Sequence, residues 1–327
     1  MSGLAAPQKN PPLKNAILIS NPLAGISIAR RPHQISRVCA VLQNGGIEAT
    51  VKFTSGVGHA QQLAREAVNQ SCDLIIVCGG DGTINEVING MADSHVPLAV
   101  LPCGTANIVA RELCLPRRMQ DAARQLASWQ RYRLPLGRAT WQESGLTRQR
   151  YFIAVAGVGF DASVVRRLDL NMKLRLGVVA YAWEAVRQVL RYDFPAFECT
   201  VNGAKISATF AVIQRSSRYA GWLQLARPHS IGKPDFSCCF FGSTSRSRYF
   251  RYALGVLTHT HHRLQDVKLI CGPAVHCTNE RTESTVYFEV DGEIAGQIPA
   301  SFEVVPDALT LLAPRTFVDR QSGGHHF

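Results

Sequence analysis

The chain has 327 residues, about twice the size of a typical single domain, so two domains are the first expectation. Its 35 basic and 24 acidic residues leave a formal net charge of +11, and 46% of its residues are hydrophobic, which excludes a disordered chain. Apolar runs stop well short of the roughly 18 residues that a membrane span needs, and residues 1–14 lack the apolar core of a signal peptide. We therefore expect a cytoplasmic protein with a flexible leader over residues 1–14 and, because its ten cysteines are scattered, reduced thiols.

Between residues 15 and 130, short apolar runs alternate with segments of helical periodicity. The pattern predicts strands at residues 16–19, 47–53, 74–77 and 98–101, and helices at residues 35–42, 60–68, 84–91 and 106–113. Strands that alternate with helices pair in parallel and bind ligands at their carboxyl ends. We expect an α/β, doubly wound nucleotide-binding domain over residues 15–130.

After residue 130 the pattern changes to longer alternating runs separated by turn signals such as Asn202-Gly203 and Asp291-Gly292. Strands are predicted at residues 151–155, 197–201, 206–214, 236–241, 267–271, 286–290 and 302–305, with one helix from about Asp161 to Arg191. This pattern predicts a β-rich, mainly antiparallel and sandwich-like α+β domain over residues 131–314, followed by a tail over residues 315–327. The Gly157–Ala162 segment fits a dinucleotide fingerprint, but no parallel strand ending in an acid follows it, so we attribute the match to chance.

The strongest local motif is Gly79-Gly80-Asp81-Gly82-Thr83, between a predicted strand and a predicted helix. Glycines allow close approach of the backbone to an anion, and the helix N-terminus directs free N–H groups at it. The lysine of a P-loop is missing. The motif predicts a phosphate site of another kind, with a tight turn capped by Asp81 as the alternative.

Three further strand-to-helix loops follow the other predicted strands. They contain Asn21-Pro22 with Gly25, Thr54 with Gly58, and Gly104-Thr105-Ala106-Asn107. Each is weak evidence by itself, because such residues are common in loops. Together they end four parallel strands at one edge, which is the layout of a nucleotide site.

In this order, the motifs resemble those of the diacylglycerol kinase catalytic-domain family, above all its soluble bacterial members, to which sphingosine and ceramide kinases are similar. The resemblance continues through residues 152–162, 219–228 and 290–293. It implies ATP on the N-terminal domain, a lipid alcohol on the C-terminal domain, an active site in the cleft between them, and Mg²⁺. The implied nucleotide-binding residues are Asn21, Pro22, Gly25, Thr54, Gly79, Gly80, Asp81, Gly82, Thr83, Asn85, Glu86, Gly104, Thr105 and Asn107.

The resemblance also implies a catalytic acidic pair, Asp291 and Glu293, on a turn of the C-terminal domain. We expect Asp291 to be the base that accepts the hydroxyl proton, with Glu293 as a metal ligand or partner of the base. Without the family context, Asp291-Gly292 reads equally as a type I′ hairpin turn. Asp81 either organises Mg²⁺ or contacts the substrate hydroxyl, and the sequence does not separate these roles.

Three departures from the family pattern concern acids. Ile108 replaces the acid that usually ends Gly-Thr-Ala-Asn-Asp, and Pro135 replaces the acid before Leu136-Gly137. Residues 232–235 read Gly-Lys-Pro-Asp where the bacterial enzymes have an Asp-Asp-Gly that helps to bind a structural Mg²⁺. We expect that structural Mg²⁺ to be lost, and a catalytic Mg²⁺ to remain with Asp81 and Glu293.

The interpretation that follows is an ATP-dependent lipid kinase acting on a primary hydroxyl of a diacylglycerol-like or sphingoid-like lipid. Alternatives are a non-catalytic nucleotide- or lipid-binding regulatory protein of the same fold and, with less support, an NAD kinase. Basic residues between Arg166 and Arg191, interleaved with leucines and Trp183, suit peripheral contact with an anionic membrane at its inner face, or an ordinary solvated helix face. No nucleic-acid-binding module is recognisable. The lipid and the oligomeric state stay open.

Overall fold

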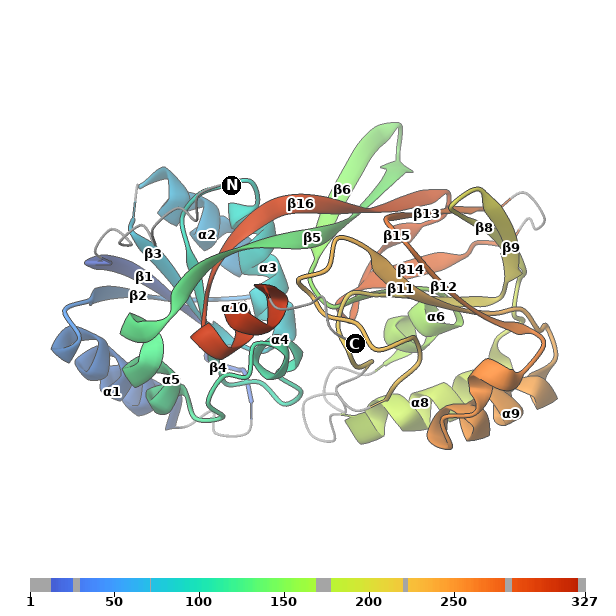
Figure 1. Ribbon diagram of the computed structural model, residues 1–327, viewed down its shortest axis with the longest axis horizontal. Helices are drawn as coiled ribbons and strands as arrows, with labels where there is room; N and C mark the ends of the chain where they lie inside the picture. Colours follow the sequence, from blue (N-terminus) through green and yellow to red (C-terminus); the bar gives the residue numbers. More distant parts are fainter. Residues whose placement is uncertain are drawn as a thin grey trace, which may run out of the picture.

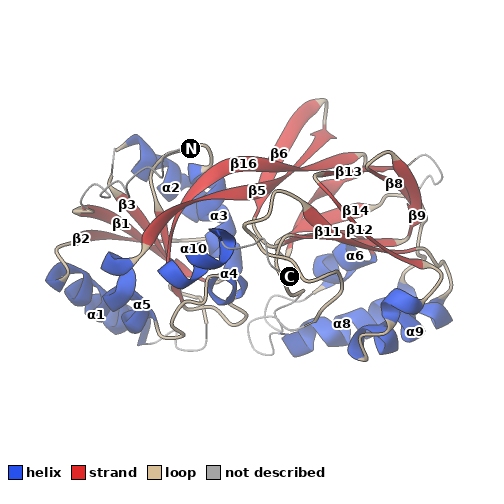
Figure 2. Cartoon of the chain, viewed as in Figure 1, coloured by secondary structure: helices blue, strands red, loops and turns tan. Residues whose placement is uncertain are grey.

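The computed structural model describes residues 13–25, 30–70, 72–168, 178–219, 223–279 and 284–322. The molecule is elongated and has two lobes, which two long strands join (Figure 1). The N-terminal lobe alternates strands and helices, and the C-terminal lobe is mainly strands (Figure 2). These features confirm the predicted fold class.

The N-terminal lobe contains a parallel sheet in the order β2-β1-β3-β4. Its strands are β1 (Asn15–Ser20), β2 (Glu48–Phe53), β3 (Leu74–Gly79) and β4 (Leu98–Pro102). Its helices are α1 (Arg31–Asn44), α2 (His59–Asn69), α3 (Asp81–Met91), α4 (Ile108–Glu112) and α5 (Met119–Gln125). Every strand and helix predicted for this half is present within four residues of its predicted bounds, and α5 is additional.

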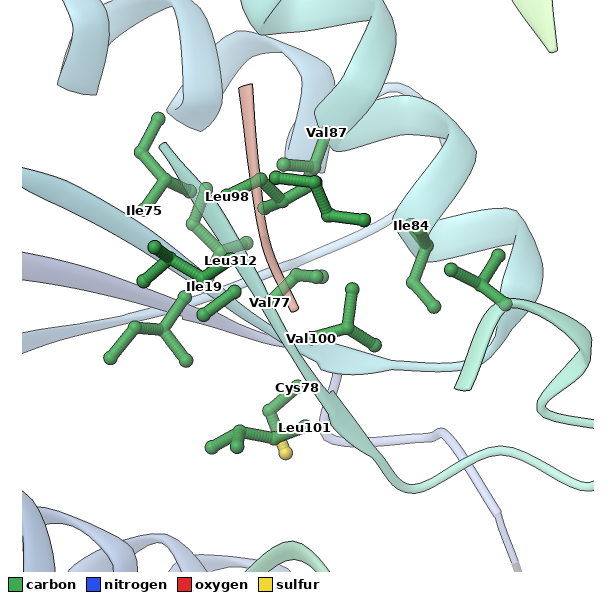
Figure 3. Close-up of a cluster of buried hydrophobic side chains, with 14 of the residues drawn as sticks. Ile19, Ile75, Val77, Cys78, Ile84, Val87, Leu98, Val100, Leu101 and Leu312 are labelled. Carbon is green, nitrogen blue, oxygen red and sulfur yellow. The ribbon is translucent and has the colours of Figure 1, made fainter. Parts of the chain in front are cut away.

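The packing of the core in this lobe explains the apolar runs seen in the sequence. β3 and β4 are buried at every position, as central strands covered on both faces should be, and their sequences are accordingly continuous apolar runs. Figure 3 shows Val100 near Ile84 of α3, with Ile75, Val77 and, from the far end of the chain, Leu312 in the same cluster.

Leu312 belongs to one of the two strands that join the lobes. β16 (Ala300–Ala313) pairs in parallel with β4 at one end and antiparallel with β5 (Gln130–Glu143) along its length. The segment after residue 314 forms α10 (Arg315–Ser322), whose Phe317 is buried in the N-terminal core. The end of the chain therefore helps to build the N-terminal lobe.

The C-terminal lobe has a six-stranded antiparallel sheet in the order β12-β11-β10-β7-β14-β15. Those strands are β7 (Val155–Gly159), β10 (Phe210–Gln214), β11 (Phe236–Phe241), β12 (Val267–Gly272), β14 (Tyr287–Val290) and β15 (Glu293–Gln297). Opposite it, the large sheet continues from β16 into β13 (Ala274–Thr278), β8 (Phe197–Val201) and β9 (Ala204–Ala208), while β6 (Leu146–Phe152) pairs with β5. Aromatic residues such as Phe152, Phe288 and Phe302 fill the space between the sheets.

Three helices pack on the outer face of the six-stranded sheet: α6 (Phe160–Arg167), α8 (Val178–Arg191) and α9 (Arg246–Leu257). The single helix expected from Asp161 to Arg191 is wrong, because α6 ends at Arg167 and Leu168 is extended, with φ −68° and ψ 118°. Leucine and arginine both favour helix, so the sequence contained no stop signal at that point.

Two predicted strands are each divided. Residues 206–214 belong to β9 and β10, which lie in different sheets, and the hydroxyl of Thr209 between them donates to the Ser243 carbonyl (2.8 Å). Residues 151–155 contain the end of β6 and the start of β7. The apolar pattern of the sequence does not reveal where the chain passes from one sheet to the other, because the segments on both sides of the change are buried. All ten cysteines are free thiols, as expected.

Candidate active site

The loops that follow the four parallel strands are fastened to one another. Asn21 Nδ2 donates to Thr83 Oγ1 (3.1 Å), which joins the loop after β1 to α3. A Cβ atom at Gly25, where φ is +74°, would lie 2.2 Å from the Cys103 carbonyl oxygen, so this glycine permits contact with the loop after β4. The guanidinium of Arg31, which is 2% exposed, donates to the same carbonyl (3.5 Å).

Glu86 fastens the loop after β2. Its Oε1 and Oε2 accept the backbone N–H groups of Gly58 (2.8 Å) and Ala60 (3.0 Å), so this carboxylate caps α2. Thr54 is buried and its N–H donates to the Ser20 carbonyl (3.0 Å). The predicted convergence of four loops at one edge of the sheet is therefore confirmed.

Glycines allow the two central loops to touch. A Cβ at Gly104 would lie 2.6 Å from Gly80 Cα, and a Cβ at Gly79 would lie 2.5 Å from Thr83 Cβ. The N-cap residue of α3, which begins at Asp81, is Gly80, and a glycine has no side chain to cap the first N–H groups of the helix. The first N–H groups of α3 can therefore bind an anion at this edge.

The loop after β4 closes on itself. Asn107, at φ +48°, accepts the Gly104 N–H at Oδ1 (2.8 Å) and donates from Nδ2 to the Gly104 carbonyl (2.9 Å). The side chain of Thr105 at the tip of this loop is exposed, whereas Pro22 in the loop after β1 is half-buried. Asn107 thus holds the loop shape, and Thr105 presents a hydroxyl to solvent.

Asp81 lies at the junction of these loops. Its Oδ1 accepts the N–H groups of Ile108 (2.8 Å) and Val109 (3.4 Å) and thereby caps α4 from another segment. Ile108, which stands where the family pattern has an acid, takes part in this contact through its backbone N–H and not through its side chain. Burial raises the pKa of Asp81 to about 6, and the nearby charge of Asp291 adds to this rise against the hydrogen bond from Val109.

Two asparagines of α3 hold the C-terminal lobe against the N-terminal lobe. Asn85 is fully buried, and its Nδ2 donates to the Tyr151 carbonyl (2.9 Å) and to Asp291 Oδ2 (2.8 Å). Asn89 accepts the Tyr151 N–H (2.8 Å) and donates to the Tyr151 carbonyl (2.9 Å). The acidic turn between β14 and β15 is therefore fixed over α3, which confirms that the two lobes meet at this site.

The carboxylate of Asp291 is fully occupied by donors. Besides Asn85, Oδ2 accepts the N–H of Ile153 (2.9 Å), and Oδ1 accepts the N–H groups of Ala154 (2.9 Å) and Val155 (3.0 Å). Burial raises the pKa of Asp291 from its ordinary value, although the backbone hydrogen bonds oppose the rise. Asp291 thus anchors the link between β6 and β7.

Glu293 has a different environment. Its Oε2 is paired with the Arg150 guanidinium, which also donates from Nη2 to Asn85 Oδ1 (2.9 Å). Its Oε1 would lie 2.7 Å from a Cβ atom at Gly82, so the missing side chain of Gly82 is what admits this carboxylate to the start of α3. Sequence reasoning missed Arg150, because a single arginine in an alternating strand carries no motif.

A pair of buried acids supports the turn from behind. Asp161 Oδ1 accepts the hydroxyls of Tyr181 and Tyr219, while its buried Oδ2 meets no N–H or O–H donor of the described chain. Glu289 hydrogen-bonds with Asp161, and burial followed by the charge of Asp161 holds the pKa of Glu289 well above its usual range. We infer that the pair shares one proton, while Glu289 Oε2 accepts the Gly292 N–H (2.6 Å).

The segment expected to have lost a structural Mg²⁺ contains a buried cation of its own. The guanidinium of Arg215, at 0% exposure, donates to the carbonyl oxygens of Pro135 (2.9 Å), Lys233 (3.1 Å) and Ile231 (2.5 Å). Burial lowers the pKa of Arg215 to about 10, so it stays charged at neutral pH. The residues present do not fit a structural Mg²⁺ here, because the guanidinium already fills the cluster of carbonyls.

The donor set beside the glycine loops does fit a catalytic Mg²⁺. Among the residues that the structure describes, no three histidine, cysteine or acidic side chains gather as metal ligands. Asp81 and Glu293 could hold the ion only together with phosphate oxygens, which is how Mg²⁺ is commonly bound in phosphoryl transfer.

Comparisons with known proteins agree with this geometry. Residues 15–139 match the model of the diacylglycerol kinase catalytic domain, and residues 154–313 match that of the YegS C-terminal NAD kinase beta sandwich-like domain. The chain is 28% identical over 302 residues to a diacylglycerol kinase of Bacillus subtilis (strain 168), covering 89% of this chain and 93% of that protein. A diacylglycerol kinase of Mycobacterium tuberculosis is 28% identical over 305 residues, covering 91% and 94%.

The fold has solved counterparts. A crystal structure of a diacylglycerol kinase from Bacillus anthracis str. Sterne matches with a TM-score of 0.72 at 22% identity, covering 93% of this chain and 98% of that one. The names of the relatives imply a kinase, and their family supports activity on lipids in general. With both lobes matched and the ordered motifs assembled at one site, the chain belongs to the diacylglycerol kinase catalytic-domain family.

Proposed function

We propose that this protein is an ATP-dependent lipid kinase that phosphorylates a primary hydroxyl of a diacylglycerol-like or sphingoid-like lipid. One observation carries the proposal: Asn85 fastens the acidic turn of the C-terminal lobe over the N-terminus of α3, where the N-cap residue is Gly80. An anion-binding helix start facing a carboxylate is what transfer of a phosphoryl group to an alcohol requires.

The triphosphate of ATP would bind to the backbone of the glycine loops. The close contact of Gly80 and Gly104 leaves the surface free of Cβ atoms, and the N–H groups at the start of α3 supply positive partial charge. Asn21 and Asn107 hold these loops in shape. Such a site binds phosphate oxygens without the lysine of a P-loop.

Glu293 is the better base. All hydrogen-bonding positions of Asp291 are taken, whereas Glu293 Oε1 lies beside Gly82 and accepts no hydrogen bond from the described residues, while Arg150 holds Oε2. In the proposed step, the lipid hydroxyl oxygen forms a bond to the γ-phosphorus and its proton passes to Glu293 Oε1. The bond between the γ-phosphorus and the bridging oxygen breaks, and ADP leaves with that electron pair.

Asp81 would be the main protein ligand of a catalytic Mg²⁺, with Glu293 close by. When bound, the ion neutralises the charge of the phosphate oxygens. Asp81 is suited to bind Mg²⁺ because the N-terminus of α4 holds its Oδ1, so that the orientation of Oδ2 is set for a metal ion. The names of the relatives support a diacylglycerol-like acceptor over a sphingoid one.

The proposed function is tested by incubating the purified full chain with γ-labelled ATP, Mg²⁺ and separate acceptors. The panel contains diacylglycerol, a sphingoid base and ceramide in mixed micelles, and NAD in solution. We expect label in diacylglycerol above all. Label in NAD alone would support an NAD kinase, and ATP binding without labelling of any acceptor would support a regulatory protein.

The pH dependence of the reaction should report on Asp81. Because the pKa of Asp81 is raised to about 6, its carboxylate is protonated below that pH and loses the charge that binds a cation. We expect kcat/KM to fall about tenfold per pH unit below pH 6 and to be flat above pH 7. The residual rate of Asp81→Asn, measured over the same range, should lack this inflection, which separates Asp81 from the ionisation of ATP itself.

A further inference from the structure

The C-terminal lobe exposes large apolar side chains along two helices. Seven of the eleven exposed large hydrophobic residues of the described chain lie on α8 and α9, each between 50% and 66% exposed. They are Val179, Trp183, Val186 and Leu190 on α8, and Phe250, Leu254 and Leu257 on α9. Spacings of three and four residues put each set along one face of its helix.

These stripes are separate from the core that the helices cover. The opposite face of α8 buries Ala180, Gln188 and Val189, and α9 buries Tyr249 and Tyr252. α8 and α9 contact each other, and Figure 1 shows them together at the lower edge of the C-terminal lobe. The two stripes therefore belong to one outer surface, which we call the α8–α9 face.

The exposed charged residues within α8 and α9 are all basic: Arg187, Arg191, Arg246 and Arg251. The acid within the two helices, Glu184, is buried and lies 3.4 Å from Arg187. The exposed Asp193 that follows α8 lies 3.8 Å from Arg246, so arginines still outnumber acids on this face. A second copy of the same face would bring arginines against arginines, so the charges favour an anionic partner.

A basic cavity adjoins this face. Arg191 of α8 lines it together with Arg166 and Arg167 of α6, so three arginines face one acid, Asp193, among its described lining residues, and its volume is about 210 Å³. The guanidinium of Arg166 lies 4.1 Å from the centre of the Tyr287 ring, which holds it in place. Guanidinium groups suit phosphate oxygens, so the cavity can take the headgroup of an anionic phospholipid.

We propose that the α8–α9 face docks the protein on a bilayer that contains anionic phospholipid. The apolar stripes enter the interface between headgroups and acyl chains, and the arginines contact the headgroups. None of the described helices is long and apolar enough to cross a membrane. The inference deepens the proposed function, on which it rests for its biological reason, because a diacylglycerol-like substrate resides in a bilayer.

Trp183 provides a direct reporter of docking. It is 58% exposed, whereas Trp129 and Trp141 are buried. Vesicles of phosphatidylcholine with about 30% phosphatidylglycerol should sediment the protein, shift its emission to shorter wavelength and allow quenching by brominated acyl chains. Vesicles of pure phosphatidylcholine should bind the protein weakly and change its emission little. The Trp183→Phe variant should lose the change in emission on binding to the anionic vesicles.

Substitutions on the α8–α9 face test whether this surface binds the vesicles. Trp183→Gln combined with Leu254→Gln should weaken binding to the anionic vesicles at least about tenfold, since two apolar side chains leave the interface. Arg187→Gln combined with Arg251→Gln should weaken binding and flatten its dependence on salt. The matched control is Leu146→Gln, because Leu146 is 57% exposed at the β5–β6 hairpin, which Figure 1 shows at the opposite edge.

Each outcome separates docking from catalysis. All variants should phosphorylate a monomeric short-chain diacylglycerol at the wild-type rate. If the wild type leaves that substrate unlabelled but still binds vesicles, the proposed kinase fails and the docking surface stands. Docking is overturned if the apolar variant binds vesicles like the wild type, or if the wild type is a dimer in solution that this variant dissociates.

Discussion

Replacement of Glu293 by glutamine is expected to lower kcat by about 10²–10⁴-fold while the Kd for ATP stays nearly unchanged. The glutamine keeps the size of the side chain and a carbonyl oxygen for Arg150, but it cannot accept the hydroxyl proton. The Glu293 side chain is 30% exposed, so the change buries no new polar group, and the folded structure is expected to persist. Rates with saturating lipid and ATP binding by calorimetry give the two quantities.

Asp291→Asn is the matched variant, since it changes the other acid of the same turn. The asparagine would turn an NH₂ group towards backbone N–H donors, so at least one of the donors at Ile153, Ala154 or Val155 loses its acceptor. We expect a loss of about 2–3 kcal/mol in the free energy of unfolding, with a smaller effect on kcat in the folded fraction. Unchanged stability with abolished transfer in this variant, and a normal rate in Glu293→Gln, would return the base to Asp291.

The fold of the N-terminal lobe was predictable because the burial of its strands is visible in their sequences. β3 and β4 are covered on both faces, so their positions appear as unbroken apolar runs followed by glycine-rich loops. Parallel strands also bring their carboxyl ends to one edge of the sheet. Loops separated by tens of residues can therefore be assigned to the same edge from the sequence. Contacts such as that of Gly80 with Gly104 then follow from the glycines.

The division of work among the acids could not be predicted. Asp291 and Glu293 are two residues apart on one turn, and their sequence neighbours give no hint that one carboxylate meets four donors and the other is partly free. Those donors come from the link between β6 and β7, more than 130 residues earlier in the chain. Roles set by such long-range hydrogen bonds have no local sequence signal.

The position of Arg215 is a second feature that the sequence could not predict, because it too depends on contacts between distant segments. The sequence shows that acids are missing around residues 232–235, but not that an arginine from the end of β10 has filled the space. Without its guanidinium, the buried carbonyls of Pro135 and Ile231 and the part-buried carbonyl of Lys233 would lose this donor. A cation carried by the chain therefore makes a bound metal ion unnecessary at this position.

Arg215→Ala should consequently destabilise the protein by about 3 kcal/mol or more, because a buried acceptor without a donor costs about 1–3 kcal/mol and two buried acceptors lose theirs, together with a part-buried one. Urea denaturation at neutral pH measures the loss. The matched control is Arg227→Ala, which removes an exposed arginine nearby in sequence and should change the free energy of unfolding by less than about 0.5 kcal/mol.

Chemical rescue distinguishes a lost cation from a lost packing volume. Millimolar methylguanidinium should raise the melting temperature of Arg215→Ala, since it binds the folded state at the vacated carbonyls, whereas methylammonium and MgCl₂ should do so much less. The wild type should melt at the same temperature with EDTA as with MgCl₂. A wild-type protein that loses stability in EDTA, or an Arg215→Ala variant restored by Mg²⁺ alone, would mean that a metal ion and not Arg215 holds this segment to β5.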